Sequence, residues 1–302
     1  MIFWGFIYKK MTVSEIIIAF TRLIISRGLK IIPKTMDNLY YKIRCKNIKK
    51  KYFVNYNNIS FFDIKGAKLP DISKSKEKMK TLALVFEDCF LIPVFYNDNY
   101  DKKLVNKLDK CTAEGPYGYT DGNFDVTVKS GDTVIDAGAW IGDFSAYAST
   151  KKAVVYAFEP AKESFSLLCE TAKLNEDRII PVQKGLSCAE GEVSMSIDSW
   201  SGGNSIVMER SAEKEIIHLT TIDRFVEENK LEKVDFIKAD IEGAERDMLR
   251  GATNVLKTFS PKLAICTYHL PDDPQVLEQI IKEANPNYTV VHLRHKLFAA
   301  VI

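Results

Sequence analysis

Apolar runs and helical stretches alternate regularly in the second half of the chain. After Gly131, runs rich in β-branched residues end in polar or small residues, at 133–138, 153–160, 179–187, 234–243 and 262–269. Stretches with helical spacing lie between several of them, such as Lys162 to Asn175 and Gly243 to Lys257. This order predicts an α/β fold, in which right-handed crossovers join parallel strands and helices cover both faces of the sheet.

The first part of the chain has a different, short-ranged pattern. Short apolar runs at 52–56, 59–64 and 81–95 predict short strands over about residues 36–110, with a helix-like run at 101–110. A turn-rich passage follows, from Ala113 to Asn123. We therefore predict a smaller mixed N-terminal region, residues 1–112, and a second domain, residues 113–302.

An apolar cluster between Ile16 and Ile25 lies near the start of the chain. Charged residues interrupt it, and it is too short for a transmembrane helix. Thr12 to Glu15 resembles a capping box and Gly28 is placed to end the helix. We expect a docked amphipathic helix and no transmembrane segment, with weak contact to a membrane surface left open.

Composition restricts the class of protein. The 302 residues are 46% hydrophobic and 27% charged, as in soluble globular proteins. A formal net charge of +2 gives no general signal for a polyanion partner, so nucleic acid is disfavoured. The six cysteines form no CxxC pair, which favours reduced thiols and a cytoplasmic location. The oligomeric state is left open.

The end of the first strand after Gly131 carries chemistry suited to a cofactor. The sequence Asp136-Ala137-Gly138 is followed by Trp140 and Gly142. A dinucleotide fingerprint needs a glycine where Trp140 stands, because the backbone there must approach a pyrophosphate. A nicotinamide-dependent oxidoreductase is thus disfavoured, and the spacing suits the methionine part of S-adenosylmethionine.

Two further strand ends carry acids. Glu159 ends the second strand, 23 residues after Asp136, where an acid can accept hydrogen bonds from both ribose hydroxyls. Asp240 and Glu242 follow another buried strand and open a helix. Each has a simpler alternative: Asp136 could cap a turn, Glu159 could be solvated, and the last two could be favoured by the helix macrodipole.

Taken together, the segments VIDAGAWIG, YAFEP and KADIEGAE, followed by MLRGA, closely resemble the FkbM family of S-adenosylmethionine-dependent methyltransferases. The resemblance covers about residues 132–270. It implies a class I methyltransferase (Rossmann-like) fold, with a seven-stranded sheet whose last strand is antiparallel. It also implies O-methylation of a hydroxyl on a small molecule or glycan acceptor. Residues 1–112 would then recognise and cover the acceptor.

The same resemblance assigns the site. By this resemblance the 136–142 loop would bind the methionine end of the cofactor, Glu159 would bind the ribose, and residues 185–187 would bind the adenine edge. The predicted cofactor-binding residues are Asp136, Gly138, Ala139, Trp140, Gly142, Glu159, Gly185, Leu186, Ser187 and Asp240. Trp140 departs from the family, which commonly has asparagine there, and an indole at that place could also stack on the cofactor or the acceptor.

We predict Asp240, Glu242 and His269 as catalytic residues. His269 ends the fifth strand, and an imidazole can act as a general base near neutral pH. A structural histidine is the alternative for His269. No metal is assigned, although the two carboxylates could instead hold Mg²⁺. A non-catalytic scaffold that binds S-adenosylmethionine is the rival to an enzyme.

Overall fold

The computed structural model describes residues 34–64, 66–76, 78–79, 117–198, 203–209, 211–293 and 295–302. These residues fall into two compact units, one made of residues 34–62 and 71–79 and the other of residues 63–70 and 117–302. The predicted N-terminal helix and the predicted elements at 81–110 lie outside the described residues. The predicted boundary at residue 112 stays a prediction.

The first unit begins with a helix that the sequence did not predict. Helix α3 spans Lys34–Tyr52, where short strands were expected, and β1 (Phe53–Tyr56) and β2 (Ile59–Ile64) follow it. Lysine and arginine favour helix over strand, and they dominate the last three turns of α3. The two strands confirm the prediction for 53–56 and 59–64, and they pair antiparallel around a turn at Asn57 and Asn58.

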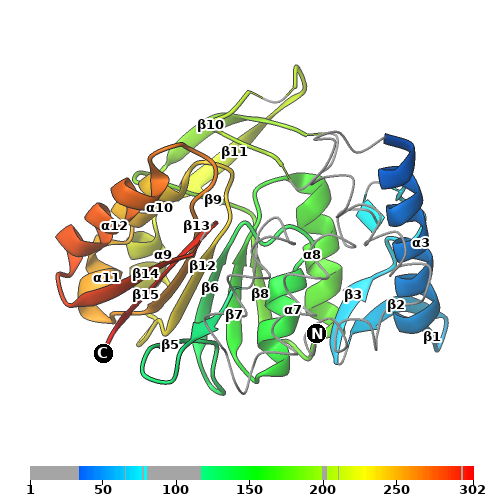
Figure 1. Ribbon diagram of the computed structural model, residues 1–302, viewed down its shortest axis with the longest axis horizontal. Coiled ribbons are helices and arrows are strands. Elements are labelled where there is room, and N and C mark those ends of the chain that lie inside the picture. Colours follow the sequence, from blue (N-terminus) through cyan, green and yellow to red (C-terminus); the bar gives the residue numbers. More distant parts are fainter. Residues whose placement is uncertain are drawn as a thin grey trace. The chain divides into compact units, whose positions relative to one another are not determined.

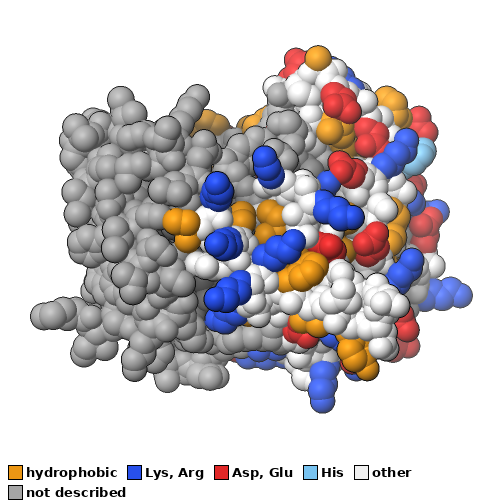
Figure 2. All heavy atoms as spheres, turned by 90° about the vertical axis from the view of Figure 1, so that its right-hand side faces the viewer, with side chains coloured by type: hydrophobic (Ala, Val, Ile, Leu, Met, Phe, Trp, Pro, Cys, Tyr) orange, Lys and Arg blue, Asp and Glu red, His pale blue; other side chains and the backbone are white. Residues whose placement is uncertain are grey.

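The lysines at the end of α3 form a solvated face. Lys46, Lys49, Lys50 and Lys51 are exposed, whereas Ile48 is buried. On the side of the molecule drawn in Figure 2, Lys and Arg side chains gather in one area and acidic side chains lie mainly in another. The exposure of the four side chains leaves this lysine run accessible to solvent.

A seven-stranded sheet forms the centre of the second unit (Figure 1). Its strand order is β14-β15-β13-β12-β6-β7-β8, and β15 is antiparallel to both of its neighbours while the other pairs are parallel. The strands are β6 (Thr133–Ala137), β7 (Val154–Phe158), β8 (Ile179–Val182), β12 (Phe236–Ala239), β13 (Lys262–Cys266), β14 (Tyr288–Leu293) and β15 (Lys296–Val301). The last strand is the antiparallel one, which confirms the predicted class I methyltransferase topology.

Helices cover both faces of this sheet, as the alternating pattern predicted (Figure 1). On one face lie α7 (Asp143–Thr150) and α8 (Lys162–Leu174), which also contact the short strand β3 (Ala67–Pro70). On the other lie α9 (Ile222–Glu228), α10 (Glu245–Arg250), α11 (Thr253–Thr258) and α12 (Asp273–Ala284). Their apolar side chains and the sheet form one large core, which includes Ile135, Ile237, Met248 and Leu277.

Two predicted elements are divided in the structure. The helix predicted at 243–257 is two short helices, α10 and α11, because the chain breaks at Gly251, a residue of low helix propensity. The strand predicted at 179–187 is β8 and β9 (Gly185–Leu186), and β9 leaves the large sheet to pair with β11 (Lys214–Thr220). Strand β10 (Gly191–Ser196) pairs antiparallel with β11. A small pair, β4 (Tyr119–Thr120) and β5 (Asp125–Val126), precedes β6.

The strand order reverses between β6 and β12. From β6 the chain proceeds to β7 and β8 on one side, and later from β12 to β13 on the other. In open α/β sheets, ligands bind outside the carboxyl ends of the strands at such a point. In the described part of the chain, no helix is long and apolar enough to cross a membrane. The Cys45 thiol donates a 3.3 Å hydrogen bond to the carbonyl of Met79.

Candidate active site

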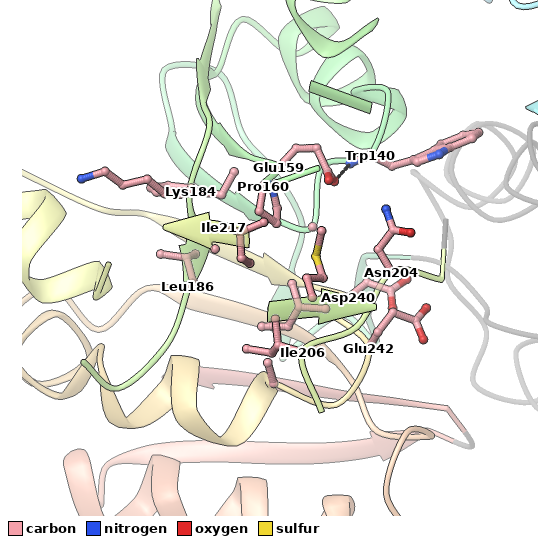
Figure 3. A pocket seen from close by; sticks show the side chains of 16 residues that line it. Trp140, Glu159, Pro160, Lys184, Leu186, Asn204, Ile206, Ile217, Asp240 and Glu242 are labelled. Carbon is pink, nitrogen blue, oxygen red and sulfur yellow. Dashed lines mark hydrogen bonds between the residues drawn. The ribbon is translucent and has the colours of Figure 1, made fainter. Parts of the chain in front are cut away.

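A pocket lies at the carboxyl ends of β6, β7 and β12, where the strand order reverses (Figure 3). It opens beside the ends of these strands and is bounded by both polar and apolar side chains. The lining residues are Gly138, Trp140, Phe158, Glu159, Pro160, Lys184, Gly185, Leu186, Met195, Asn204, Ile206, Ile217, Asp240, Ile241, Glu242 and Ala244. The three strand ends singled out by the sequence therefore meet at one place.

The predicted cofactor residues divide into two groups. Those in the lining are Gly138, Trp140, Glu159, Gly185, Leu186 and Asp240. Those outside the lining are Asp136, Ala139, Gly142 and Ser187. Of the predicted catalytic residues, Asp240 and Glu242 line the pocket, and His269 contacts both of them from outside the lining.

Gly138 is required where the loop after β6 meets the end of β12. Its φ is 73°, and a Cβ at this position would lie 2.0 Å from the backbone oxygen of Asp240. Its amide and that of Ala139 both donate to the Phe158 carbonyl, at 3.1 and 2.9 Å. These amides were expected to face the methionine end of the cofactor, but here they hold β6 against β7.

Asp136 lies beneath the surface of the loop after β6 and does not line the pocket. Its side chain is fully buried, and its carboxylate lies 3.0 Å from Nζ of Lys238 and accepts a 2.6 Å hydrogen bond from Ser145. The Lys238 ammonium also donates to the carbonyls of Ala137 and Gly138. Burial lowers the pKa of Lys238, but the nearby carboxylates outweigh this and hold it above its usual value. The pair is thus a charged support for the loop that follows β6.

Gly142 and Ser187 also have structural tasks. A Cβ on Gly142, whose φ is 86°, would lie 2.8 Å from Leu168 of α8, so this glycine permits α7 and α8 to pack closely. The Ser187 amide donates to the carbonyl of Thr220 at 2.9 Å, which fixes the end of β9 against β11. Neither residue needs a cofactor to explain its place.

Glu159 is the buried acid of the pocket. Its side chain accepts hydrogen bonds from the amides of Trp140 at 3.0 Å and Ala161 at 2.9 Å (Figure 3). Burial raises the pKa of Glu159 to about 7, although these amides and the charge of Lys238 favour the carboxylate. Each carboxylate oxygen has two lone pairs, so two amides leave capacity for hydroxyl donors.

Trp140 lies in the left-handed region of backbone conformation, with φ 49°. Asparagine visits that region more readily than a bulky residue does, which gives a physical reason for the asparagine common at this place in the family. The Trp140 side chain is buried, and its backbone amide is bound to Glu159. The substitution therefore keeps the backbone contact with Glu159.

The apolar wall of the pocket comes from residues that the motifs did not indicate. Met195, Ile206 and Ile217 lie beside Leu186 in the lining. They belong to β10, β11 and the segment between them, and the sequence pattern of that region predicted no site. An apolar wall beside Gly185 and Leu186 suits the flat face of an adenine ring.

His269 meets three carboxylates at the other end of the pocket. Its Nε2 lies 3.6 Å from Asp240 Oδ1 and 3.5 Å from Glu242 Oε2, and its Nδ1 lies 3.0 Å from Glu245 Oε1. The imidazole is 1% exposed. The sequence predicted that His269 lies near Asp240 and Glu242, but it missed Glu245, which is part of the same DIEGAE segment.

This environment shifts the pKa of His269. Burial lowers the pKa of its imidazole, but the three facing carboxylates outweigh burial and raise the pKa to about 11. A general base must be unprotonated at the operating pH. The facing carboxylates therefore favour the charged imidazole while no metal or substrate is bound, and the action of His269 as the general base stays a prediction.

Asp240 has a distinct hydrogen-bonding environment. Its two oxygens accept from the hydroxyls of Tyr117 at 2.5 Å and Tyr268 at 3.2 Å. Burial raises the pKa of Asp240, but the charges of Lys238, His269 and Lys296 and the Tyr117 hydrogen bond outweigh this and lower it. Asp240 is therefore a stable carboxylate at the pocket wall.

Comparison with known proteins identifies the family. The profile of the Methyltransferase FkbM domain matches residues 136–288, which is just over half of the chain. The chain belongs to the FkbM methyltransferase family. This family match favours a methyltransferase over the alternative of a nicotinamide-dependent oxidoreductase.

Two curated methyltransferases and one solved structure are similar to this chain. Hexuronic acid methyltransferase AglP of Haloferax volcanii is 31% identical over 164 residues, which are 54% of this chain and 66% of that protein. Methyltransferase 1 of Beauveria bassiana is 27% identical over 168 residues, 48% of this chain and 63% of that protein. The match thus spans less than two thirds of either relative's own length. The crystal structure of methyltransferase FkbM from Methylobacillus flagellatus shares 19% identity and a TM-score of 0.48, over 87% of this chain and 60% of that one.

Proposed function

We propose that this protein is an S-adenosylmethionine-dependent O-methyltransferase that methylates a hydroxyl of a small molecule or glycan. The observation that carries the proposal is the convergence of Gly138, Glu159 and Asp240 on one pocket at the switch point of the sheet. The family match supports a methyltransferase. The relative named for hexuronic acid supports an acceptor of the sugar class.

The pocket suggests how the cofactor lies. We assign the ribose hydroxyls to the Glu159 carboxylate and the adenine ring to the apolar wall that includes Leu186 and Ile217. The sulfonium end then lies toward Asp240 and Glu242, where negative charge favours a cation. The amides of Gly138, Ala139 and Trp140 are already bonded within the chain. We therefore assign the methionine end to side chains such as that of Asn204, which lines the same region (Figure 3).

Methyl transfer itself is a direct displacement. The acceptor oxygen forms a bond to the methyl carbon as the bond from that carbon to sulfur breaks, and S-adenosylhomocysteine leaves as a neutral thioether. Orientation of the two reactants supplies much of the rate. Because Glu242 lines the pocket and His269 does not, we assign the acceptor's hydroxyl proton to the Glu242 carboxylate. His269 positions Asp240 and Glu242.

The proposal is tested by methyl transfer from labelled S-adenosylmethionine to a panel of uronic acid glycosides and neutral glycosides. We expect a product that resists mild alkali, because a methyl ether survives conditions that hydrolyse a methyl ester. Release of the label by alkali would contradict O-methylation of a hydroxyl. Cofactor binding without transfer to any acceptor would support the rival proposal of a non-catalytic scaffold.

A pair of variants tests the assignment of the proton. Glu242→Gln should lower turnover by roughly 10² to 10⁴ and leave the affinity for S-adenosylhomocysteine within about threefold. The matched control is Glu227→Gln, an exposed carboxylate of α9 whose replacement should leave turnover unchanged. Equal turnover in the Glu242 variant and the wild type would refute the assignment.

The role of residues 1–112 remains a proposal: they select and cover the acceptor. Strand β3 contacts α7 and α8 and belongs to the compact unit that contains the large sheet. Removal of residues 1–112 would delete β3 and expose the surfaces of α7 and α8 that it covers. A cytoplasmic location and the absence of nucleic acid partners likewise remain predictions from the sequence.

A further inference from the structure

We propose that Asp240, Glu242 and His269 bind a divalent transition-metal ion at the acceptor end of the pocket. One oxygen of each carboxylate and one nitrogen of the imidazole lie within 4.8 Å of one another. The three residues come from the loop after β12 and from the end of β13, which are neighbouring strands. Metal binding stands on these residues alone, and only its part in methyl transfer rests on the proposed function.

The separations suit ligands of a common ion. Nε2 of His269 lies 3.6 Å from Asp240 and 3.5 Å from Glu242. Two ligand atoms that are each about 2.1 Å from an ion, at an angle of about 110–120°, lie roughly 3.4 to 3.6 Å apart. The distances also exceed those of hydrogen bonds between nitrogen and oxygen. The three groups therefore surround a shared point, and the imidazole makes no hydrogen bond of normal geometry to either carboxylate.

The imidazole is held as histidine ligands of metals usually are. Its Nδ1 faces the buried carboxylate of Glu245 at 3.0 Å, which leaves Nε2 directed at Asp240 and Glu242. Metal-binding histidines commonly have such a carboxylate behind them, which fixes the ring and its tautomer. Among the described residues, neither ring nitrogen makes a hydrogen bond of normal geometry, although the side chain is 1% exposed. A buried nitrogen of this kind calls for a partner.

The backbone also holds Glu242 in a special conformation. Glu242 has φ 55°, a left-handed conformation that costs about 1 to 2 kcal/mol for a residue with a Cβ. Glu245 accepts the amides of Ile241 and Gly243, and the hydroxyl of Ser205 donates to the Glu242 carbonyl. One buried carboxylate therefore shapes the loop that carries Glu242 and also orients His269.

The donor set indicates the class of metal. Imidazole together with carboxylates suits Mn²⁺, Co²⁺ and Zn²⁺ better than Ca²⁺, which prefers oxygen ligands alone. Three protein ligands leave coordination positions open toward the pocket, where Asp240 and Glu242 lie in the lining. An acceptor with two neighbouring oxygen donors, such as a hydroxy acid or a vicinal diol, fits those positions. The ion would hold the acceptor oxygen beside the cofactor's methyl group.

The test is a titration of the full chain with Mn²⁺. Bound metals are first removed with a chelator, and Mn²⁺ binding is then measured by electron paramagnetic resonance. We expect one site per chain. Asp240→Asn and His269→Gln should weaken Mn²⁺ binding at least about 10-fold, and Glu245→Gln about 10- to 100-fold through misorientation of the imidazole. The matched control is His292→Gln, which removes an exposed histidine that also faces a glutamate, at 2.6 Å. The control should bind Mn²⁺ as the wild type does.

Two further measurements keep the outcomes distinct. Thermal unfolding shows whether each variant is folded. If the His269 variant is unfolded, Glu242→Gln takes its place, because the Glu242 side chain is more exposed than that of His269. Binding of S-adenosylhomocysteine, measured on the same samples without metal, tests the proposed function separately. Absence of Mn²⁺ binding by the wild type at millimolar concentration, or undiminished binding by the Asp240 and Glu242 variants, would overturn the metal site even if S-adenosylhomocysteine binds. Metal binding without cofactor binding would uphold the site and contradict the proposed function.

Discussion

The ammonium of Lys238 lies 3.0 Å from the carboxylate of Asp136, and the two side chains are 5% and 0% exposed. Lys238 is on β12 and Asp136 is on β6, at paired positions of neighbouring parallel strands. Removal of one member of a buried ion pair leaves an uncompensated charge. The stability of the loop after β6 thus depends on a pair that joins the two strands between which the strand order reverses.

Replacement of Lys238 by methionine should therefore destabilise the protein. We expect a loss of about 3 to 5 kcal/mol in the free energy of unfolding, measured with urea. Lys233→Met is the matched control, because Lys233 forms a 2.7 Å pair with Asp235 at a site where both side chains are about one third to one half exposed. Its cost should be about 0 to 1 kcal/mol. Similar costs for the two variants would argue against a buried, charged pair.

The raised pKa of Glu159 should make the stability of the ligand-free protein depend on pH. Its pKa is about 7 in the folded protein and near 4.5 when exposed, so folding favours the protonated form. This contribution is fully present below pH 4.5 and is lost as pH rises through 7, by roughly 3 kcal/mol. Urea unfolding of the wild type and of Glu159→Gln, at pH 5 and at pH 8, isolates the contribution of Glu159 to the free energy of unfolding. The wild type should lose more stability than the variant, and parallel losses would contradict the buried acid.

Binding of S-adenosylhomocysteine should show the opposite dependence on pH. Ribose hydroxyls donate to the ionised carboxylate, so the affinity should rise from pH 5.5 to pH 8 by roughly 10- to 30-fold. Glu159→Ala should weaken binding at pH 8 by about 1 to 3 kcal/mol, because a charge-assisted hydrogen bond is lost. Titration calorimetry measures both effects. An affinity in the wild type that is constant over this range would refute the assignment of the ribose to Glu159.

Two glutamates of the same loop should differ in their effect on stability. Glu242→Gly removes a side chain from a left-handed backbone position, so we expect a change of no more than about 0.5 kcal/mol, or a gain. Glu245→Ala leaves the amides of Ile241 and Gly243 without their acceptor and should cost about 2 to 4 kcal/mol. Urea unfolding compares them directly. Equal costs would show that Glu245 does not organise the loop.

The sequence predicted the parts of the site that lie at the ends of regular strands. Glu159 and Asp240 follow buried apolar runs, and the carboxyl ends of parallel strands meet at one edge of a sheet. Their convergence could therefore be expected before any distance was known. The same logic placed His269 near Asp240, because it ends the adjacent strand.

Contacts between distant segments could not be predicted in this way. Tyr117 donates to Asp240 across 123 residues of sequence, and Lys238 reaches Asp136 only because β12 pairs with β6. The apolar wall from β10 and β11 follows no motif. The environment of His269 was hidden for a related reason: the pKa of His269 depends on Glu245, which accepts a hydrogen bond from the amide of Gly243 at the turn before α10.

The central claim is that the pocket at the ends of β6, β7 and β12 binds S-adenosylmethionine. Titration calorimetry of the full chain with S-adenosylhomocysteine at pH 8, with NADH as the comparison ligand, tests it most directly. We predict one S-adenosylhomocysteine bound per chain, weakened in Glu159→Ala, and no binding of NADH. Binding of NADH in place of S-adenosylhomocysteine, or S-adenosylhomocysteine binding of equal strength in Glu159→Ala, would contradict the account.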